Sequence, residues 1–320
     1  ILLRLLCGTC AKVQKGMVVQ MKKKRNIFLE MKKNWAAYLL LAPFMILFFV
    51  FTIMPVFVTL GISFTTYNIL ESPVFVGLDN YKRLFLNDDI FAIAIKNTLI
   101  FALFTGPLGY VLSFLASWAI NETSKRLRGL LTFVFYIPSI SGTIYTIWTI
   151  IFSGDMYGYA NSFLMRMGFI VEPIQWFTTE QYILPLIIVV QLWMSLGTGF
   201  LAMRAGLSSI DTQYYEAGAI DGVKNRFQEL FYITLPMMAP HLMTAAVLQI
   251  TAMFSNATVA QNLAGFPSTN YAGHLVMTHL MDYSTFRVER GYASAIAVLL
   301  FLIMIILNQI ILRVMRKVDV

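Results

Sequence analysis

The chain has 320 residues, of which 58% are hydrophobic and only 12% are charged, and its formal net charge at pH 7 is +8. Its mean hydropathy is +0.71. Soluble globular domains carry about 25% charged residues, so this composition excludes an ordinary water-soluble domain. It indicates a protein that is surrounded mainly by lipid.

The first segment, residues 1–34, is basic, and we expect it to be a cytoplasmic N-terminal tail. It does not begin with methionine, and Met21 heads a run of basic residues, so we expect the natural start near Met17 or Met21. Cys7 and Cys10 have the C-x-x-C spacing of redox motifs, but the chain lacks the βαβ pattern that accompanies them, and we interpret them as incidental. The opening apolar stretch is too short for the core of a signal peptide.

Residues 35–320 are predicted to form one transmembrane domain. A bilayer core about 30 Å thick needs about 20 apolar residues for each helical crossing. Six stretches qualify: Trp35–Phe64, Phe91–Ile120, Leu130–Phe152, Tyr182–Met203, Leu235–Phe254 and Tyr292–Leu312. The sequence therefore predicts an all-α, polytopic membrane protein with about six transmembrane helices.

The 24 basic residues are distributed unevenly over the segments that connect these stretches. Eighteen lie on the side of the N-terminus and six on the other side. Because cytoplasmic segments are enriched in Lys and Arg, we expect both termini in the cytoplasm. The positive charge thus indicates orientation in a membrane, and it argues against a nucleic-acid partner.

Several residue types that carry chemistry are missing from the expected spans. None of the six stretches contains Asp or Glu, whereas a proton- or sodium-coupled carrier usually needs a carboxylate at membrane depth. The chain also lacks a G-x-x-x-x-G-K-[ST] phosphate loop, so it is not expected to hydrolyse ATP or to hold a cofactor. His274 and His279, with Asp282 nearby, permit a metal site but hardly support one. We expect a non-enzymatic protein whose energy comes from elsewhere.

Neutral polar residues interrupt the apolar stretches at a few positions. They are Gln191, Ser195, Thr198, Gln249, Thr251 and Asn256. Polar groups are costly in a membrane helix unless they face a bundle interior or a wet cavity, and neutral donors and acceptors suit uncharged, hydroxyl-rich cargo. The first three would share one helical face by their i, i+4, i+7 spacing, and Trp193 offers a ring that could stack on a sugar. Hydrogen bonds between neighbouring helices explain the same residues equally simply.

The segment at about 205–234 turns polar and is expected to carry short helices. Asp211 lies where an N-cap would be, Gly222 would end or bend a first helix, and Pro236 suits the first turn of the next one. Apolar residues at Phe227 and Phe231 would give one apolar face. These features alone fit a solvated loop whose amphipathic helices lie on the lipid headgroups.

The same segment carries a more specific pattern. Its residues read Glu216-Ala217-Gly218-Ala219-Ile220-Asp221-Gly222, followed by Ile233-Thr234-Leu235-Pro236. This resembles the EAA loop of ABC importer permeases, whose pattern is E-A-A, three residues, G, a spacer and I-x-L-P. Gly218 stands where a second Ala is usual, and the spacer is one residue longer than the pattern. The resemblance implies that Glu216, Ala217, Gly218, Asp221 and Gly222 couple this chain to an ATPase subunit.

The resemblance extends over most of the chain, from Leu41-Ala42-Pro43 through Tyr136-Ile137-Pro138-Ser139 to the last apolar stretch, and is strongest to maltose-permease-like carbohydrate permeases. It implies the type I importer fold in a bacterial cytoplasmic membrane, with a second homologous permease, two ATPase copies that bind ATP and Mg, and an external solute-binding protein as partners. The expected cargo is a sugar or oligosaccharide. The resemblance places Gln191 at the position of an Asn of that family, and Met253 and Asn256 at positions of its sugar-contacting Asn residues. Ser195 and Thr198, four and seven positions after Gln191, complete the candidate substrate path.

Other functions remain open at this point. A related permease could carry a polyol, glycerol phosphate or a peptide, although a phosphate-bearing cargo would want basic residues that the apolar stretches hardly provide beyond Lys96. A stand-alone channel or carrier would transport without partners. An intramembrane enzyme is disfavoured, because no acid, base or metal cluster falls at membrane depth.

Overall fold

The computed structural model describes residues 34–255 and 258–318, and the chain forms two compact units, residues 1–58 and 59–320. Cys7, Cys10 and Asn256 lie outside the described residues, and so does the basic tail apart from Asn34.

The described part of the first unit is helical. Helix α3 (Trp35–Phe48) continues through a π-helical turn, η1 (Phe49–Ile53), into α4 (Met54–Ile62), which runs on into the second unit. None of the residues in these three elements is buried. A helix that is apolar on every side and has no buried face is suited to a lipid environment, which agrees with the first predicted span.

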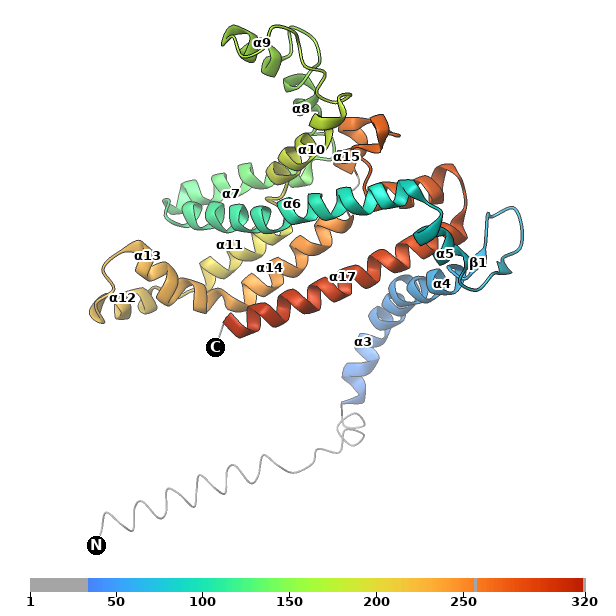
Figure 1. Ribbon diagram of the computed structural model, residues 1–320. Helices are drawn as coiled ribbons and strands as arrows, with labels where there is room; N and C mark the ends of the chain where they lie inside the picture. Colours follow the sequence, from blue (N-terminus) through green and yellow to red (C-terminus); the bar gives the residue numbers. More distant parts are fainter. Residues whose placement is uncertain (1–33, 256–257, 319–320) are drawn as a thin grey trace. The chain divides into compact units, whose positions relative to one another are not determined.

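The second unit contains one short antiparallel pair of strands, in which Thr65 lies opposite Phe75. Its other described elements are helical (Figure 1). In chain order the elements are β1 (Thr65–Thr66), β2 (Val74–Phe75), α5 (Asp79–Leu86), α6 (Asp89–Asn121), α7 (Lys125–Ile140), α8 (Thr146–Ile151), α9 (Tyr159–Arg166), α10 (Glu180–Met194), α11 (Thr198–Ser209), α12 (Thr212–Ile220), α13 (Arg226–Glu229), η2 (Leu230–Thr234), α14 (Leu235–Ser255), α15 (Thr258–Ala264), η3 (Thr269–Tyr271), α16 (Val276–Met281), η4 (Asp282–Phe286) and α17 (Arg290–Val318).

Five helical segments in the described part of the chain are long and apolar enough to cross a membrane. They are Trp35–Ile62, Asp89–Asn121, Glu180–Ser209, Arg226–Ser255 and Arg290–Met315. These confirm the all-α class, and they overlap five of the six stretches expected to cross the membrane.

The remaining expected stretch, Leu130–Phe152, is not one continuous helix in the structure. Helix α7 has 16 residues and ends at Ile140, and α8 begins only at Thr146. Pro138 and Gly142 flank the point of interruption, and Ser141 has an extended backbone that ends α7. Proline and glycine interrupt helical hydrogen bonding, so this short run of residues accounts for the break.

The core of the second unit lies where α6, α11, α14 and α17 pack together. Figure 1 shows α14 between α11 and α17 in the bundle, with α6 crossing beside them. Side chains of Met203, Met238 and Ala245 fill the contact between α11 and α14. At one point these two helices approach very closely: a Cβ added to Gly206 would lie only 2.7 Å from Cβ of His241. Small residues at such crossings allow close backbone packing in membrane helices.

A buried asparagine fixes one of the loops at the end of the bundle. The side-chain amide of Asn97 in α6 donates to the carbonyls of Tyr271, Ala272 and His274, at 3.1–3.2 Å. Buried backbone carbonyls need hydrogen-bond partners, so this amide fixes the loop before α16 against α6.

The close approach at Gly206 gives a first prediction. Replacing Gly206 with Ala should lower the free energy of unfolding by about 1–3 kcal/mol, because the added methyl group meets the fixed Cβ of His241 rather than the end of a flexible chain. Gly129→Ala in α7 is the matched control, since nothing lies within 4 Å of its added Cβ and alanine favours a helix. Thermal unfolding of both variants in detergent measures the difference; equal melting temperatures would contradict the packing described here.

Candidate functional site

A polar cavity of about 210 Å³ lies between α6, the end of α7, the α10–α11 junction and α14. All its lining residues are uncharged: Thr105, Tyr136, Ser139, Gln191, Met194, Ser195, Gly197, Thr198, Gly199, Gln249, Ala252 and Met253. Hydroxyl and amide groups predominate among the polar ones, and they can both donate and accept hydrogen bonds. The cavity therefore offers neutral hydrogen bonding inside a membrane-spanning bundle.

The cavity lies where a membrane-spanning helix is interrupted. Helix α10 ends at Met194 and α11 begins at Thr198, so the expected single helix through Gln191, Ser195 and Thr198 is broken. The prediction that these three residues share one face of a continuous helix is therefore wrong. All three nevertheless line the same cavity. Irregular backbone is tolerated at membrane depth where it is covered by protein or lines a wet cavity.

Local hydrogen bonds stabilise this break. The Ser195 hydroxyl donates to the Leu192 carbonyl at 2.6 Å, and the Gly197 amide donates to the Ser195 carbonyl at 2.8 Å. From α6, Ser113 donates to that same Ser195 carbonyl at 3.4 Å. The last turn of α7 closes on the break from another side, because a Cβ on Gly197 would lie 3.4 Å from Cβ of Ser139.

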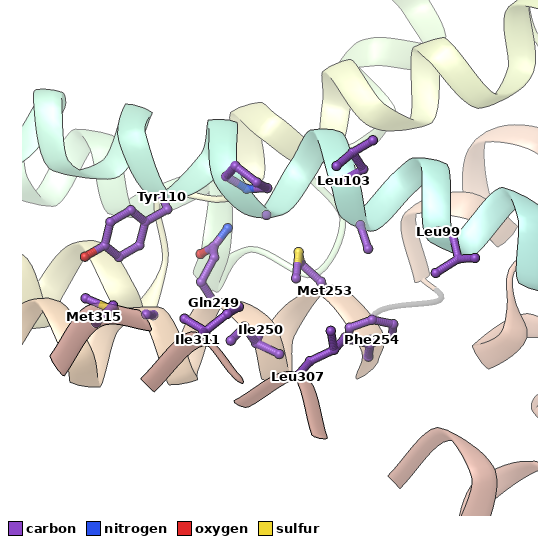
Figure 2. A pocket seen from close by; sticks show the side chains of 14 residues that line it. Leu99, Leu103, Tyr110, Gln249, Ile250, Met253, Phe254, Leu307, Ile311 and Met315 are labelled. Carbon is purple, nitrogen blue, oxygen red and sulfur yellow. The ribbon is translucent and has the colours of Figure 1, made fainter. Parts of the chain in front are cut away.

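Gln249 and Met253 of α14 separate this cavity from a second, apolar one. Figure 2 shows both side chains rising from α14 toward α6. Gly109 of α6 makes room for the glutamine, since a Cβ there would lie 2.6 Å from its Nε2 atom. Gly106 does the same for Met253, whose sulfur would lie 2.5 Å from an added Cβ. The two residues line both cavities and form the wall between them.

The apolar groove beyond this wall has a volume of about 500 Å³ and lies between α6, α14 and α17. Leu99, Leu103, Phe254, Leu307 and Ile311 are among the side chains that line it (Figure 2). Such a surface matches lipid chains or apolar helices, because it offers few hydrogen-bonding groups. The larger of the two cavities is therefore not the one suited to polar cargo.

The residues predicted for a substrate path fall in different places. Gln191, Ser195, Thr198 and Met253 line the polar cavity, and Gln191 and Ser195 are buried. Trp193 does not line it: its ring packs edge-on against Trp148, with 5.5 Å between the ring centroids. Asn256 lies outside the described residues.

Four polar lining residues, Thr105, Tyr136, Ser139 and Gln249, were not among the predicted substrate contacts. The sequence marks Gln249 only as a neutral polar residue of an apolar stretch, and Tyr136 and Ser139 only as parts of a motif with no assigned role. Nothing in the sequence distinguishes Thr105 from an ordinary helix threonine. In the structure its hydroxyl donates to the Phe101 carbonyl at 2.7 Å, as threonines in helices commonly do.

The 205–234 segment folds into short helices at the end of the bundle where α6 ends and α7 begins (Figure 1). Asp211 is the N-cap of α12, as predicted, and accepts a hydrogen bond from the amide of Gln213 at 3.1 Å. After α12, Gly222 has a φ of +95°, and the amide of Val223 donates to the carbonyl of Gly218 at 2.9 Å. This is a Schellman motif, which requires the left-handed backbone that glycine adopts most readily.

Gly218 and the longer spacer, the two departures from the EAA pattern, both have a structural counterpart. A Cβ on Gly218 would lie 2.5 Å from Cδ1 of Ile233, so the glycine lets α12 rest on the start of the next helix. Tyr215 and Thr234 link the same two elements through their hydroxyls, at 3.1 Å. The extra spacer residue coincides with η2, a π-helical turn that accommodates one residue more than an α-turn.

Many side chains of this segment are exposed. Glu216 and Ala217 are exposed on α12, while Gly218 is buried beneath them. Ile220, Phe227 and Tyr232 are also more than half exposed. Exposed apolar and aromatic side chains are typical of a protein interaction surface.

A buried polar network lies at the other end of the bundle, where α6 and α17 begin. Nε2 of His274 lies 3.1 Å from Nδ1 of His279, whose Nε2 lies 3.1 Å from Oδ2 of Asp88. Tyr292 donates to the same carboxylate oxygen at 2.6 Å, and the amide of Phe91 donates to Oδ1 of Asp88 at 2.9 Å. Because an ionised carboxylate only accepts, two neutral histidines have a single arrangement, with each Nε2–H donating along the chain.

The electrostatics of this network favour that neutral arrangement. Burial, together with the neighbouring His279, lowers the pKa of His274 to about 4. Burial also lowers the pKa of His279, against the opposing effect of Asp88. For Asp88, burial raises the pKa, but the hydrogen bonds from Tyr292 and the Phe91 amide outweigh it and the pKa is lowered. The network therefore holds one negative charge and two neutral imidazoles near neutral pH.

These spans, with a neutral cavity at a helix break and an exposed helical segment at one end, describe a multi-pass membrane protein built for transport. The chain belongs to the family of binding-protein-dependent transport system inner membrane components, whose pattern matches residues 106–320.

Known relatives support this assignment over nearly the whole length. The probable ABC transporter permease protein YesP of Bacillus subtilis is 31% identical over 92% of this chain and 93% of its own length. The arabinooligosaccharides transport system permease protein AraP of the same organism is 30% identical over 90% of each chain. A bacterial alginate ABC transporter, solved with an alginate pentasaccharide-bound periplasmic protein, shares the fold, with a TM-score of 0.73 over 92% of this chain and 99% of that one at 22% identity. The fold is that of type I ABC importer permeases.

The histidine network predicts a dependence of stability on pH. The folded protein disfavours protonated His274, so its contribution to stability is complete above a pH of about 6.5 and is lost as the pH falls toward 4. Asp88, whose pKa is lowered, loses its contribution only at still lower pH. We expect the free energy of unfolding to drop by about 2 kcal/mol between pH 7 and pH 4.5.

Melting temperatures over this pH range test the expectation. His274→Gln should flatten the drop, because glutamine does not titrate. His241→Gln, which changes a histidine outside the network, should retain it. The same pH dependence in both variants would contradict the assignment.

Proposed function

We propose that this chain is one of the two permease subunits of an ATP-driven importer and that it conducts a sugar or an oligosaccharide. The observation that carries the proposal is the uncharged cavity at the α10–α11 break, whose hydroxyl and amide groups match hydroxyl-rich cargo. Its volume of about 210 Å³ is below the roughly 300–1,000 Å³ of sites that enclose a whole ligand. It would therefore contact a short stretch of sugar at a time.

The relatives support a carbohydrate. AraP is named for the transport of arabinooligosaccharides, and the solved neighbour imports alginate. The latter cargo is acidic, whereas the cavity here has only uncharged lining residues, so a neutral sugar is the better match.

In this proposal the 205–234 segment lies in the cytoplasm and passes the movement of an ATPase to the permease. Glu216, Ala217, Gly218, Asp221 and Gly222 form the coupling motif, and the exposed face of α12 supports contact with a partner. The buried Gly218 and the bond between Tyr215 and Thr234 tie α12 to the start of α14, which carries Gln249 and Met253. Two ATPase copies would hold ATP and Mg.

The proposed importer also requires further partners. A second, homologous permease would complete the path, and an external solute-binding protein would deliver the sugar, as the periplasmic protein in the alginate complex suggests. The chain would lie in a bacterial cytoplasmic membrane with both termini inside, residues 1–34 forming the tail and residues 35–320 the membrane domain.

Co-purification and uptake test this function. The tagged chain is extracted from its native membrane in mild detergent, and the proteins that accompany it are identified by mass spectrometry. A second permease and an ATPase in fixed proportion are expected, and after reconstitution the assembly should take up neutral oligosaccharides in preference to a polyol, glycerol phosphate or a peptide. Transport by the chain alone would instead favour a stand-alone carrier.

Glu216→Lys tests the coupling. The charge reversal falls on an exposed residue of α12, so the variant should assemble in the membrane but lose at least about tenfold in ATP-driven uptake. Glu172→Lys, which makes the same change at an exposed position outside the segment, should keep most of the uptake. Normal uptake by the Glu216 variant would reject the coupling role.

A further inference from the structure

A row of aromatic side chains follows α10 along one side. Its members are Trp193, Trp148, Phe152, Trp176 and Tyr182, in the order in which their rings touch. Consecutive ring centroids lie 5.5, 5.8, 5.4 and 5.4 Å apart. Trp193 and Tyr182 are about three helical turns apart, so they lie on the same side of α10 and the row extends over about 16 Å.

One end of this row adjoins the polar cavity. Trp193 is followed directly by Met194 and Ser195, which both line that cavity. Met194 also packs against the same buried cluster as Trp148. The other end of the row lies at residues 152–179, the connection between α8 and α10, which is outside in the proposed orientation. The row therefore leads from the outer connection to the polar cavity.

The rings of the row are fixed in place but not covered. Nε1 of Trp176 donates to Oδ1 of Asn161 at 2.9 Å. Asn161 is fully buried, and its own amide donates to the carbonyls of Ser153 and Ile174, both at 3.0 Å. Each aromatic side chain of the row is nevertheless partly exposed. A ring that is already fixed loses little conformational freedom when a ligand packs on it.

We propose that this aromatic row is a second carbohydrate-binding site, on which the units of an oligosaccharide pack before they reach the polar cavity. The C–H groups of a sugar ring pack well on the face of an aromatic ring, which carries partial negative charge. The polar cavity, at about 210 Å³, is too small for a whole oligosaccharide, so a longer chain needs contacts beyond it. The inference rests on the proposed function and extends its sugar path outward.

A row that only stabilised the fold would behave differently. Ring contacts contribute to packing whether or not a ligand binds, so the loss of one ring would change the melting temperature or the affinity for all sugars alike. A carbohydrate site instead predicts an effect that depends on the length of the sugar, because only a chain longer than the polar cavity reaches the row.

Calorimetric titration of the purified permease assembly in lipid nanodiscs provides the test. The solute-binding protein is left out, since its own affinity would otherwise enter the result. The probes are arabinooligosaccharides and maltooligosaccharides, each as the disaccharide and as longer chains. Trp193→Leu and Phe152→Leu remove a ring but keep an apolar side chain, and each should weaken the binding of the longer chains by about fivefold while the affinity for the disaccharide is unchanged.

Two further variants serve as controls. Trp193→Phe retains an aromatic ring and should restore most of the affinity for the longer chains. Trp35→Leu removes an exposed tryptophan of α3, outside the row, and should bind like the wild type. Melting temperatures of the leucine variants close to that of the wild type would establish that the lost affinity is not a loss of fold.

Equal affinities of the wild type and both row variants for the longer chains would overturn the proposal, and so would an equal loss of affinity for the disaccharide and the longer chains. It is also overturned if the wild type binds none of the probes. In that case sugar uptake by the reconstituted importer would leave the proposed function standing, whereas the absence of uptake would reject that function as well.

Discussion

Inside a bilayer, a backbone amide or carbonyl that leaves the helical pattern has no water to bond to, and each such group must find a partner within the protein. The break between α10 and α11 satisfies this requirement with serines: Ser195 bonds back to Leu192, and Ser113 of a neighbouring helix bonds to the carbonyl of Ser195. Of these side chains, Ser195 also lines the polar cavity. The same serine thus supports the irregular backbone and contributes to the uncharged wall of the cavity.

The surrounding helices keep the polar cavity apart from the apolar groove. The side chains of Gln249 and Met253 of α14 have the hydroxyl and amide groups of the polar cavity on one side and the apolar groove beside α17 on the other. Glycines on α6 permit this arrangement, because a side chain at Gly109 would displace the amide of Gln249. Charged residues gather at the two ends of the bundle, in the network around Asp88 and in the arginines around Asn121.

Much of the fold could be predicted from the sequence, because it depends on properties of short segments. Apolar length gave five of the helical crossings, and the side chain of Asp211 and the backbone freedom of Gly222 marked both ends of α12. The predictions failed where contacts between distant segments determine the continuity of a helix or the position of a side chain. Hydropathy cannot distinguish a continuous span from α7 and α8, and the position of Trp193 was set by the ring of Trp148 rather than by its own helix. The pairing of Arg204 with Asn121 joins residues that are far apart in the chain, so no spacing could reveal it.

The π-helical turn at Leu230–Thr234 bears on how relatives of this chain are found and aligned. A π-turn accommodates one additional residue inside a helix without altering the register on either side, so η2 has the geometry that suits the surplus residue relative to the common motif. Pattern searches that require a fixed distance between Gly222 and Ile233 would pass over such a chain. An alignment that places the gap in the loop would shift every residue between the loop and α14 by one position, or about 100° around the helix axis.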